Sequence, residues 1–599
     1  MVAAGLSDVL LLLFMNEKSG GQEMNTFRHK KLFVAANSIF LTVLLVGCGG
    51  SGSTSSLTTC TSFTYSAWGA CANGLQSRTI LTSSPTSCTG GTPVVSQSCG
   101  VDTSGGAPGG GGTEYHVGAG QTYTTLGAVP WYQLQAGDTV YIHPGTYHEK
   151  ILISTSGTAT QWIRVRGVPD ASGNLPVISG NGATTSANNH WRWADPAIVQ
   201  WDAVVAIAPS TDTAVPPHYV EIANLEVRDG SPSYNFTAEN GASSPYEDFS
   251  ACIYTRSPVH LLVRDNVVHN CGQGFYNWTG DGSTDQWWGA LAADIVIRNN
   301  YFYDNGWANV YTSHQTYTEA NGVVIEGNRF GTPKSGMWGN QIKDRSAGTV
   351  VRYNYIEQSP QGYDIDLVEP QEGCPSLCYS TGASISPNSK YLQAFVYGNI
   401  FVNTTGTDIN LIHWNEDHQV GQGRATEANG RLYFYNNTVV NMTNWAIEFN
   451  QTFGGYDCPG YALPGRIDFR NNIVYSGYAG YTFGEYCHDT GQGNFDFGVN
   501  WVTPGYTLQA ANTTGTSNLF PSSGNTPGFT NLSTGDVTLT SGSAAHGAGA
   551  SLSPAVTSNN LGLDLTPTQQ YVYPHVTPTP KTKARTTSGA GSDFGARGQ

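Results

Sequence analysis

Charged side chains are scarce in this sequence, and most of those present are acidic. Asp, Glu, Lys and Arg make up 12% of the 599 residues, and 43 acidic against 27 basic residues give a formal net charge of −16. Because binding to nucleic-acid phosphates needs a basic surface, nucleic acid is excluded as a partner. The shortage of good helix formers such as Lys and Glu, beside 73 Gly and 29 Pro, argues against a helical protein. The composition instead favours many short strands joined by turns.

Long apolar runs are also lacking, except for one near the N-terminus. The segment 24–48 reads MNTFRHKKLFVAANSIFLTVLLVGC, a basic start followed by the apolar stretch 32–46, which is the pattern of an export signal. The stretch is short for a membrane span. Its end, Leu-Val-Gly-Cys, resembles a bacterial lipobox, which implies that Cys48 becomes the lipidated first residue of a cell-envelope protein facing the periplasm or the exterior. An ordinary signal peptide or a membrane anchor is the alternative.

The remaining composition shifts complete a domain scheme. We expect the membrane to be contacted only through the lipid anchor, and the protein to be a monomer. The scheme predicts a signal region 1–47, in which 1–23 precede the natural start at Met24, a lipidated tether 48–59, a small module 60–99, a Gly-rich linker 100–113, a main domain 114–573 and a flexible polar tail 574–599.

The cysteine count agrees with export. Eleven cysteines leave an even number once Cys48 is set aside, which in an exported chain implies disulfides. Free buried thiols are the alternative, and no pair of Cys-x-x-Cys motifs suggests zinc. Proximity in the sequence pairs Cys252 with Cys271, Cys374 with Cys378, and Cys458 with Cys487.

The module 60–99 carries four further cysteines, at 60, 71, 88 and 99. Its stretch 65–78, YSAWGACANGLQSR, resembles a thrombospondin type 1 repeat. The resemblance implies a cation–π contact between Trp68 and Arg78 and a role in adhesion or spacing. It is partial, because the module has four cysteines and one tryptophan.

The main domain contains an internal repeat, an apolar residue followed three positions later by Asn. Successive repeats lie 26 residues apart from Asn328 to Asn354, and 45 apart from Asn354 to Asn399, which suits coils of three short strands with inserted loops. Asn tolerates the left-handed conformation of a sharp corner, and stacked amides can bond one another. The repeat comprises Asn266, Asn300, Asn328, Asn354, Asn399, Asn437 and Asn472, with Asn224 as a weaker eighth member.

This repeat resembles the right-handed parallel β-helix of the pectate-lyase-like superfamily. Segment 136–147, AGDTVYIHPGTY, is similar to the first coils of such proteins, and segments 527–529 and 537–543 to the last coil. A leucine-rich horseshoe lacks its Leu register here, and a propeller needs a more even period. The predicted fold class is therefore all-β, a right-handed parallel β-helix preceded by a small disulfide-rich module.

A strip of polar residues follows the repeat on successive coils. Because side chains alternate along a strand, Ile342 and Ile365 should point inward while Lys343 and Asp366 point outward, within ~5 Å of each other. Ile447 and Glu448 repeat this pattern further along. In a chain so poor in charge, such a strip predicts a functional site.

The first chemistry that fits is β-elimination on a uronic-acid polysaccharide, in which a base removes the proton α to a neutralised carboxylate. Lys343 is the expected base and Arg345 the expected carboxylate clamp. The stretch 340–346, NQIKDRS, resembles the Lys-bearing strand of the chondroitinase B and alginate lyase family, although the next coil has Asp-Ile-Asp in place of that family's Arg. A carboxylate beside a lysine opposes a base role, so we expect Asp364, Asp366 and Glu369 to hold Ca²⁺.

Two other functions stay open. Glycoside hydrolysis could use paired carboxylates from Asp364, Asp366, Glu369 and Glu448, with His413 or His314 as acid or base in either chemistry. A non-catalytic glycan-binding adhesin is the third reading. The expected substrate-binding residues are His314, Gln341, Trp287, Trp288, Trp338 and Trp414, since exposed rings stack on sugars. The sequence predicts a lipid-anchored polysaccharide lyase.

Overall fold

The computed structural model describes the chain from the end of the tether onward, with gaps. It describes residues 59–60, 62–66, 75–86, 88, 96–98, 111–191, 200–210, 215–279, 291–357, 359, 361–371, 377–378, 387–403, 410–418, 421–451, 458, 460–487, 493–521, 526–586 and 593–597. The expected signal region, Cys48, Trp68, Cys374, Trp287 and Trp288 lie outside these ranges. Of the two compact units, Met1–Thr59 and Cys60–Gln599, only the second is described to any extent.

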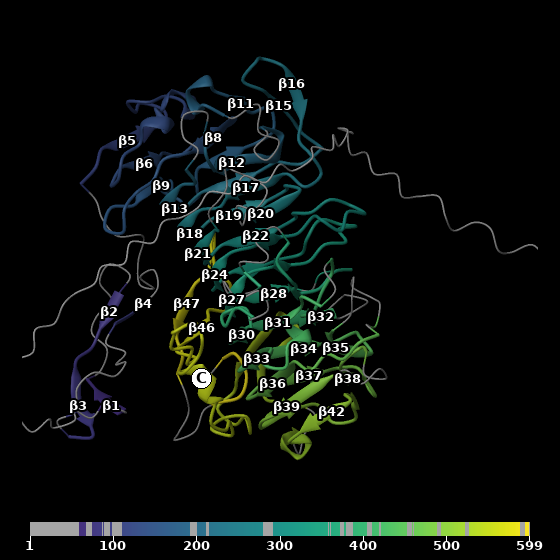
Figure 1. Ribbon diagram of the computed structural model, residues 1–599. Helices are drawn as coiled ribbons and strands as arrows, with labels where there is room; N and C mark the ends of the chain where they lie inside the picture. Colours follow the sequence, from purple (N-terminus) through teal and green to yellow (C-terminus); the bar gives the residue numbers. More distant parts are fainter. Residues whose placement is uncertain are drawn as a thin grey trace, which may run out of the picture. The chain divides into compact units, whose positions relative to one another are not determined.

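Three parallel sheets, called A, B and C here, wind around one core (Figure 1). From residue 259 onward the chain passes from A to B to C and back to A in each coil, so consecutive strands of one sheet come from consecutive coils. All neighbours pair in parallel except β15 and β16 at one end of sheet C. Among the described residues there is no α-helix, and none of their helical turns is long and apolar enough to cross a bilayer. The predicted all-β right-handed parallel β-helix is confirmed.

The strands of each sheet are given in spatial order. Sheet A comprises β5 (Glu114–Val117), β6 (Thr139–Ile142), β9 (Ile163–Gly167), β13 (His218–Ala223), β18 (Val259–Arg264), β21 (Ala293–Arg298), β24 (Asn321–Glu326), β27 (Ala347–Arg352), β30 (Gln393–Tyr397), β33 (Arg431–Tyr435), β36 (Arg466–Arg470), β39 (Asn494–Phe497) and β42 (Asn512–Thr514). Sheet B comprises β7 (Thr146–Tyr147), β10 (Val177–Ser179), β14 (Glu226–Arg228), β19 (Val267–His269), β22 (Tyr301–Tyr303), β25 (Arg329–Phe330), β28 (Tyr355–Glu357), β31 (Ile400–Asn403), β34 (Thr438–Asn441), β37 (Ile473–Ser476), β40 (Asn500–Val502) and β43 (Leu519–Pro521).

Sheet C carries the polar strip. It comprises β16 (Ser243–Pro245), β15 (Asn235–Thr237), β11 (Thr184–Thr185), β8 (Glu149–Ile153), β12 (Ala203–Ile207), β17 (Ala251–Arg256), β20 (Gln273–Trp278), β23 (Thr316–Thr318), β26 (Ile342–Asp344), β29 (Ile365–Leu367), β32 (Asn410–His413), β35 (Ala446–Asn450), β38 (Thr482–Gly484) and β41 (Thr507–Gln509). Short 3-10 turns join some strands, among them η1 (Leu126–Ala128), η2 (Trp131–Gln133), η3 (Ala187–Asn189), η4 (Gln200–Asp202) and η5 (Arg424–Thr426).

The small N-terminal module forms two antiparallel pairs. Strand β1 (Ser62–Tyr65) pairs with β3 (Ile80–Ser84), and β2 (Leu75–Ser77) pairs with β4 (Ser96–Ser98). A disulfide joins Cys60 to Cys88. The guanidinium of Arg78 lies 3.7 Å from the ring centre of Tyr65. Its expected partner, Trp68, is outside the described residues, so the resemblance to a thrombospondin repeat stays a prediction.

The corner between sheets A and B is built on a ladder of buried asparagine amides. Each Nδ2 donates to the Oδ1 of the ladder asparagine one coil further on, over 2.9 to 3.3 Å, and the same Oδ1 accepts the backbone N–H. The second Nδ2 hydrogen goes to a backbone carbonyl of the preceding coil, as from Asn354 to Ile325. The ladder contains the seven predicted asparagines and one more, Asn500.

The left-handed residue of this corner is not the ladder asparagine, as the sequence suggested, but the residue before it. Positive φ angles occur at Asp265, Asn299 and Gly327, each of which precedes a ladder member. This offset explains Asn224, the weak eighth repeat. Asn224 itself has φ +58°, so it is the left-handed residue, and the ladder position falls on Leu225, whose N–H donates to Asn266.

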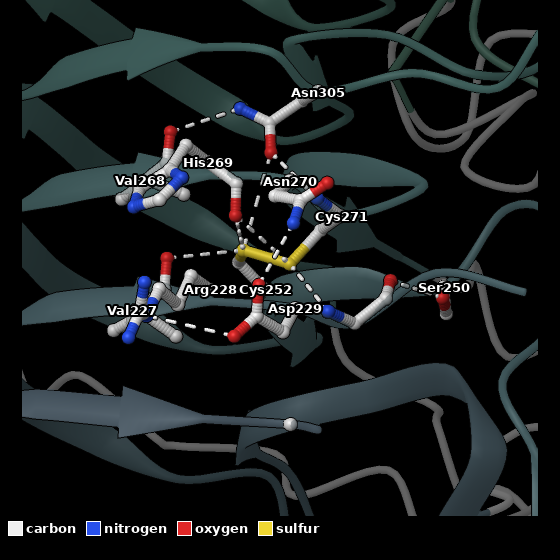
Figure 2. The surroundings of a disulfide bond; sticks show 12 residues. Val227, Arg228, Asp229, Ser250, Cys252, Val268, His269, Asn270, Cys271 and Asn305 are labelled. Carbon is white, nitrogen blue, oxygen red and sulfur yellow. Dashed lines mark hydrogen bonds and ion pairs between the residues drawn. A yellow bond between two sulfur atoms is a disulfide. The ribbon is translucent and has the colours of Figure 1, made fainter. Parts of the chain in front are cut away.

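The corner between sheets B and C is held by a disulfide and by buried amides (Figure 2). Cys252 of β17 is joined to Cys271, which follows β19, and both are fully buried. On the next coil Asn305 accepts the N–H of Cys271 at 3.1 Å and donates to Val268 and to Gln315. The predicted pairs Cys252–Cys271 and Cys458–Cys487 are both present.

The C-terminal segment corrects one prediction. The residues described between 574 and 597 are not a loose tail but pack along the cylinder. Strand β46 (Gln569–Tyr571) forms a hairpin with β47 (Thr582–Ala584), and Phe594 and Ala596 are fully buried. Phe594 packs with Ile473 of sheet B, whose outer face would otherwise be an apolar surface. A second hairpin, β44 (Phe529–Asn531) with β45 (Asp536–Leu539), precedes it.

Substitution Asn354→Ala should lower the free energy of unfolding by at least about 2 kcal/mol. It removes the acceptor of both the N–H and the amide of Asn328, and a buried polar group left without a partner costs roughly 1–3 kcal/mol. Chemical denaturation measures the change. The exposed Asn235→Ala is the control, and equal effects of the two variants would contradict a structural ladder.

Candidate functional site

One outward column of sheet C carries the predicted strip. The register pairs Lys343 of β26 with Asp366 of β29, and Asp366 with His413 of β32. The flanking residues Ile342 and Ile365 are in the core, as alternation requires. Lys343 and Asp366 therefore face the same way on adjacent coils, as predicted.

Lys343 lies between two carboxylates. Its Nζ is 2.6 Å from Oδ2 of Asp366 and also contacts Oδ2 of Asp417, which comes from the segment after β32. These ion pairs use the ammonium form, which has three donors and no lone pair to accept a proton. The geometry therefore makes Lys343 a fixed positive charge rather than the expected base.

Arg345 completes a pair of cations around Asp417. Its Nη2 contacts Oδ1 and Oδ2 of Asp417 at 2.8 and 2.7 Å, and Nη1 donates to the backbone carbonyl of Glu369 at 2.6 Å. The Arg345 side chain is 2% exposed, against 18% for Asp417. The expected carboxylate clamp thus holds a carboxylate, but one that belongs to the chain itself.

His413 is oriented by Asp366. Its Nδ1 lies 2.7 Å from Oδ1 of Asp366, and its ring stacks on that of Tyr363 with 5.0 Å between centroids. With the Nδ1 proton donated to the carboxylate, Nε2 is the nitrogen that accepts a proton. A histidine held by a carboxylate in this way has the orientation of a general base. Its side chain is only 1% exposed, so a substrate reaches it only if the covering segment moves.

Asn340 links this pair to His314. Its Nδ2 donates to Asp366 Oδ2 at 2.7 Å, and its N–H donates to His314 Nδ1 at 2.9 Å. Burial, with the nearby positive charge of Lys343, lowers the pKa of His314 to about 3. His314 is thus neutral near pH 7, and it presents its Nε2–H as a donor.

The carboxylates divide into two electrostatic classes. Burial alone would raise the pKa of Asp366, but Lys343 and His413 outweigh it and leave the pKa below its usual value. Lys343 and Arg345 likewise outweigh burial and hold the pKa of Asp417 far below its ordinary value. In contrast, burial raises the pKa of Asp364 to about 8, because only a backbone N–H of Ser359 offsets it.

The three expected calcium ligands do not form a metal site as they stand. Asp366 contacts Lys343, His413 and Asn340, while both Glu369 oxygens accept backbone N–H groups, from Asp417 and His418. Asp364 has its pKa raised, which opposes the charged form that Ca²⁺ requires. No group of three or more His, Cys, Asp or Glu suited to a metal occurs in the described part of the chain.

Two residues expected to contact substrate and one expected to be catalytic lie outside the column. Gln341 is fully buried at the corner between sheets B and C and donates to the backbone carbonyls of Gly331 and Glu357. Trp414 is fully buried in the core. Glu448, expected to be catalytic, is outside the column, because the register pairs it with Asn410 while His413 pairs with Asn450.

Trp338 does lie near the strip, two residues before Asn340. Its half-buried ring lies 4.7 Å from that of Tyr311, which is 66% exposed. This pair is an accessible aromatic surface beside His314. The other two tryptophans expected to bind substrate, Trp287 and Trp288, belong to a stretch outside the described residues.

Sequence reasoning missed Asp417 and a run of tyrosines. Asp417 stands in a charged stretch, NEDH, but its place against Lys343 depends on the path of the segment after β32, which has no periodic pattern. The tyrosines precede Lys343 in the same column, on β17, β20 and β23: Tyr254, Tyr276 and Tyr317. Aligning the strands on the buried residues would have revealed them.

Comparison with known proteins gives likenesses to solved structures only. No protein-family model and no curated protein match the chain. A pectate lyase is similar over 82% of this chain and 98% of its own, at 12% identity and a TM-score of 0.40. A rhamnogalacturonan lyase is similar over 70% of this chain and 91% of its own, at 13% identity and a TM-score of 0.37. An alginate lyase is similar over 66% of this chain and 53% of its own, also at 13% identity and a TM-score of 0.37. Such low values support no inference about chemistry, which has to come from the residues.

The two classes of carboxylate predict opposite pH effects. Asp364 has a folded pKa of about 8 against an ordinary 3.8, so the folded state loses stability as pH rises between these values. Asp364→Asn should therefore raise the thermal midpoint at pH 8.5 and leave it nearly unchanged at pH 4. The pKa of Asp366 is instead lower in the folded state than its ordinary value of 3.8, so its charge stabilises the folded state at pH values above 3.8.

The matched variant Asp366→Asn should lower the midpoint at pH 7. The difference in midpoint between this variant and the wild type should shrink as pH falls below 3.8. Below that value the carboxylate of the unfolded wild type takes up a proton, and the stabilisation by its charge is lost. Scanning calorimetry across pH 3–9 compares the variants. The same pH dependence in both would contradict the assignment of the charges.

Proposed function

We propose that this protein is a polysaccharide lyase that cleaves a uronic-acid polymer by β-elimination, with His413 as the base. The observation that supports it is the Asp366–His413 pair next to two fixed cations, Lys343 and Arg345, on one face of sheet C. Export, and an anchor at Cys48, belong to the same proposal.

The reaction needs two features that this cluster supplies. Nε2 of His413 takes the proton α to the sugar carboxylate, and the electron pair left on carbon forms a double bond as the bond to the glycosidic oxygen breaks. Solvent protonates the departing oxygen. The positive charges stabilise the carboxylate as negative charge develops on it in the transition state.

The electrostatics favour elimination over hydrolysis. A hydrolase needs one carboxylic acid that stays protonated near neutral pH beside a second carboxylate. Asp366 and Asp417 both have lowered pKa values, so neither is a proton donor. The third carboxylate of the cluster, Glu369, has a raised pKa, but it is fully buried and both of its oxygens accept backbone N–H groups. Asp364 is protonated, but it faces the corner at Ser359 rather than the cluster.

The assay incubates the purified protein with polygalacturonate, alginate and glycosaminoglycans, and follows the absorbance of unsaturated uronides together with new reducing ends. At least one acidic polymer should give both signals. His413→Gln should lower kcat by about 10²–10⁴, the range that a general base contributes. His269→Gln is the matched control, because His269 pairs with Glu226 on sheet B, away from the cluster.

Three outcomes would overturn the proposal. Reducing ends without the unsaturated band indicate a hydrolase. Binding without cleavage indicates an adhesin. Full activity in His413→Gln removes the base from the mechanism.

A further inference from the structure

Asp417 stands where a substrate carboxylate would have to bind. Its two oxygens contact Nη2 of Arg345, and one of them also contacts the ammonium of Lys343. Charge-assisted hydrogen bonds from a guanidinium to a carboxylate are also the contacts by which proteins recognise carboxylates in ligands. Lys343 and Arg345 are called the cation cradle below.

The cation cradle lies beneath Asp417. The Lys343 and Arg345 side chains are 6% and 2% exposed, while that of Asp417 is 18% exposed. The next residue, His418, has a side chain that is 55% exposed. Asp417 is thus the outermost member of the cluster, and it separates the cradle from solvent.

A carboxylate anchors the backbone of the segment that carries Asp417. The N–H groups of Asp417 and His418 donate to the two oxygens of Glu369, at 3.0 and 2.7 Å. Burial, and repulsion by Asp417, raise the pKa of Glu369, so these two carboxylates oppose each other. The charge of Asp417 therefore binds the cradle and at the same time weakens the anchor of its own segment.

We propose that Asp417 is an internal competitor for the cation cradle, which it occupies at rest and releases to the carboxylate of an acidic sugar. The inference rests on the proposed function and deepens it, because it makes a carboxylate-bearing sugar the substrate class of this site. An exchange of one carboxylate for another keeps the charge of the cluster constant. The cradle is then never left as two buried cations without a counter-charge, which is costly.

The competition also favours long substrates. A carboxylate on the same chain has a high effective concentration at its site, so a free monosaccharide displaces it poorly. A polymer that also binds neighbouring coils gains contacts that offset the displacement.

Nε of Arg345 is buried without a hydrogen-bond partner in the described structure, so the guanidinium retains a donor that Asp417 does not use.

The rival explanation is a static ion pair that only stabilises the fold. Removing Asp417 would then destabilise the protein and create no binding site. Glu221 provides a matched control, since its buried carboxylate lies between Arg166 and Arg264 at 2.5 and 2.6 Å on sheet A.

The experiment measures binding of D-galacturonate to the full chain by titration calorimetry at low salt, with galactose as the neutral probe. Asp417→Asn should bind galacturonate at least about tenfold more tightly than the wild type, a difference of ~1.4 kcal/mol. Galactose should bind equally to both, and Glu221→Gln should behave as the wild type. Unchanged or weaker binding of galacturonate to Asp417→Asn would overturn the inference.

A second measurement, of thermal stability in acetate, applies even if the loss of Asp417 prevents folding. Acetate should raise the thermal midpoint of Asp417→Ala, or restore its folding, because an anion that binds only the folded state stabilises it. If acetate shifts the midpoint of Asp417→Ala no more than those of the wild type and Glu221→Gln, the result contradicts the cradle. Both readouts are independent of catalysis. Tighter binding in a protein without lyase activity would support the cradle and reject the proposed reaction. Lyase activity without tighter binding would support the reaction and reject the cradle.

Discussion

The ladder of buried asparagines is the constraint on which the rest of the structure depends. Each amide bonds the next, so every coil is fixed in register with its neighbours at the corner between sheets A and B. A strand that slipped by one residue would exchange its inner and outer faces. The fixed register keeps Ile342 and Ile365 in the core, and thereby places Lys343 and Asp366 side by side on the outer face.

The same register joins chemistry from distant parts of the sequence. His413 lies 47 residues from Asp366 in the chain and Asp417 lies 74 from Lys343, yet all four side chains meet. The disulfide and the amides at the second corner complete this rigidity, because Cys252, Cys271 and Asn305 hold adjacent coils together. A rigid base of this kind suits a reaction that requires a proton acceptor and a cation at fixed separation.

Periodic features of the fold could be read from the sequence, and local ones could not. The repeat predicted the β-helix and the pairing of Lys343 with Asp366, because ladder and alternation are regular. It gave Asn224 the wrong role, since the left-handed residue and the ladder residue are neighbours. Glu448 was misplaced because the register pairs His413 with Asn450 instead, and Gln341 because it stands at a corner, where alternation ends. Asp417 was missed because a segment outside the strands brings it to the cradle.

The most direct test is a crystal structure of the His413→Gln variant with an acidic oligosaccharide bound. We expect one sugar over the outer column of sheet C, with its carboxylate on Lys343 and Arg345 and its α carbon facing position 413. Asp417 should have left the cradle. An oligosaccharide bound to another sheet, or one bound with its carboxylate away from Lys343 while Asp417 stays in place, would contradict the central claim.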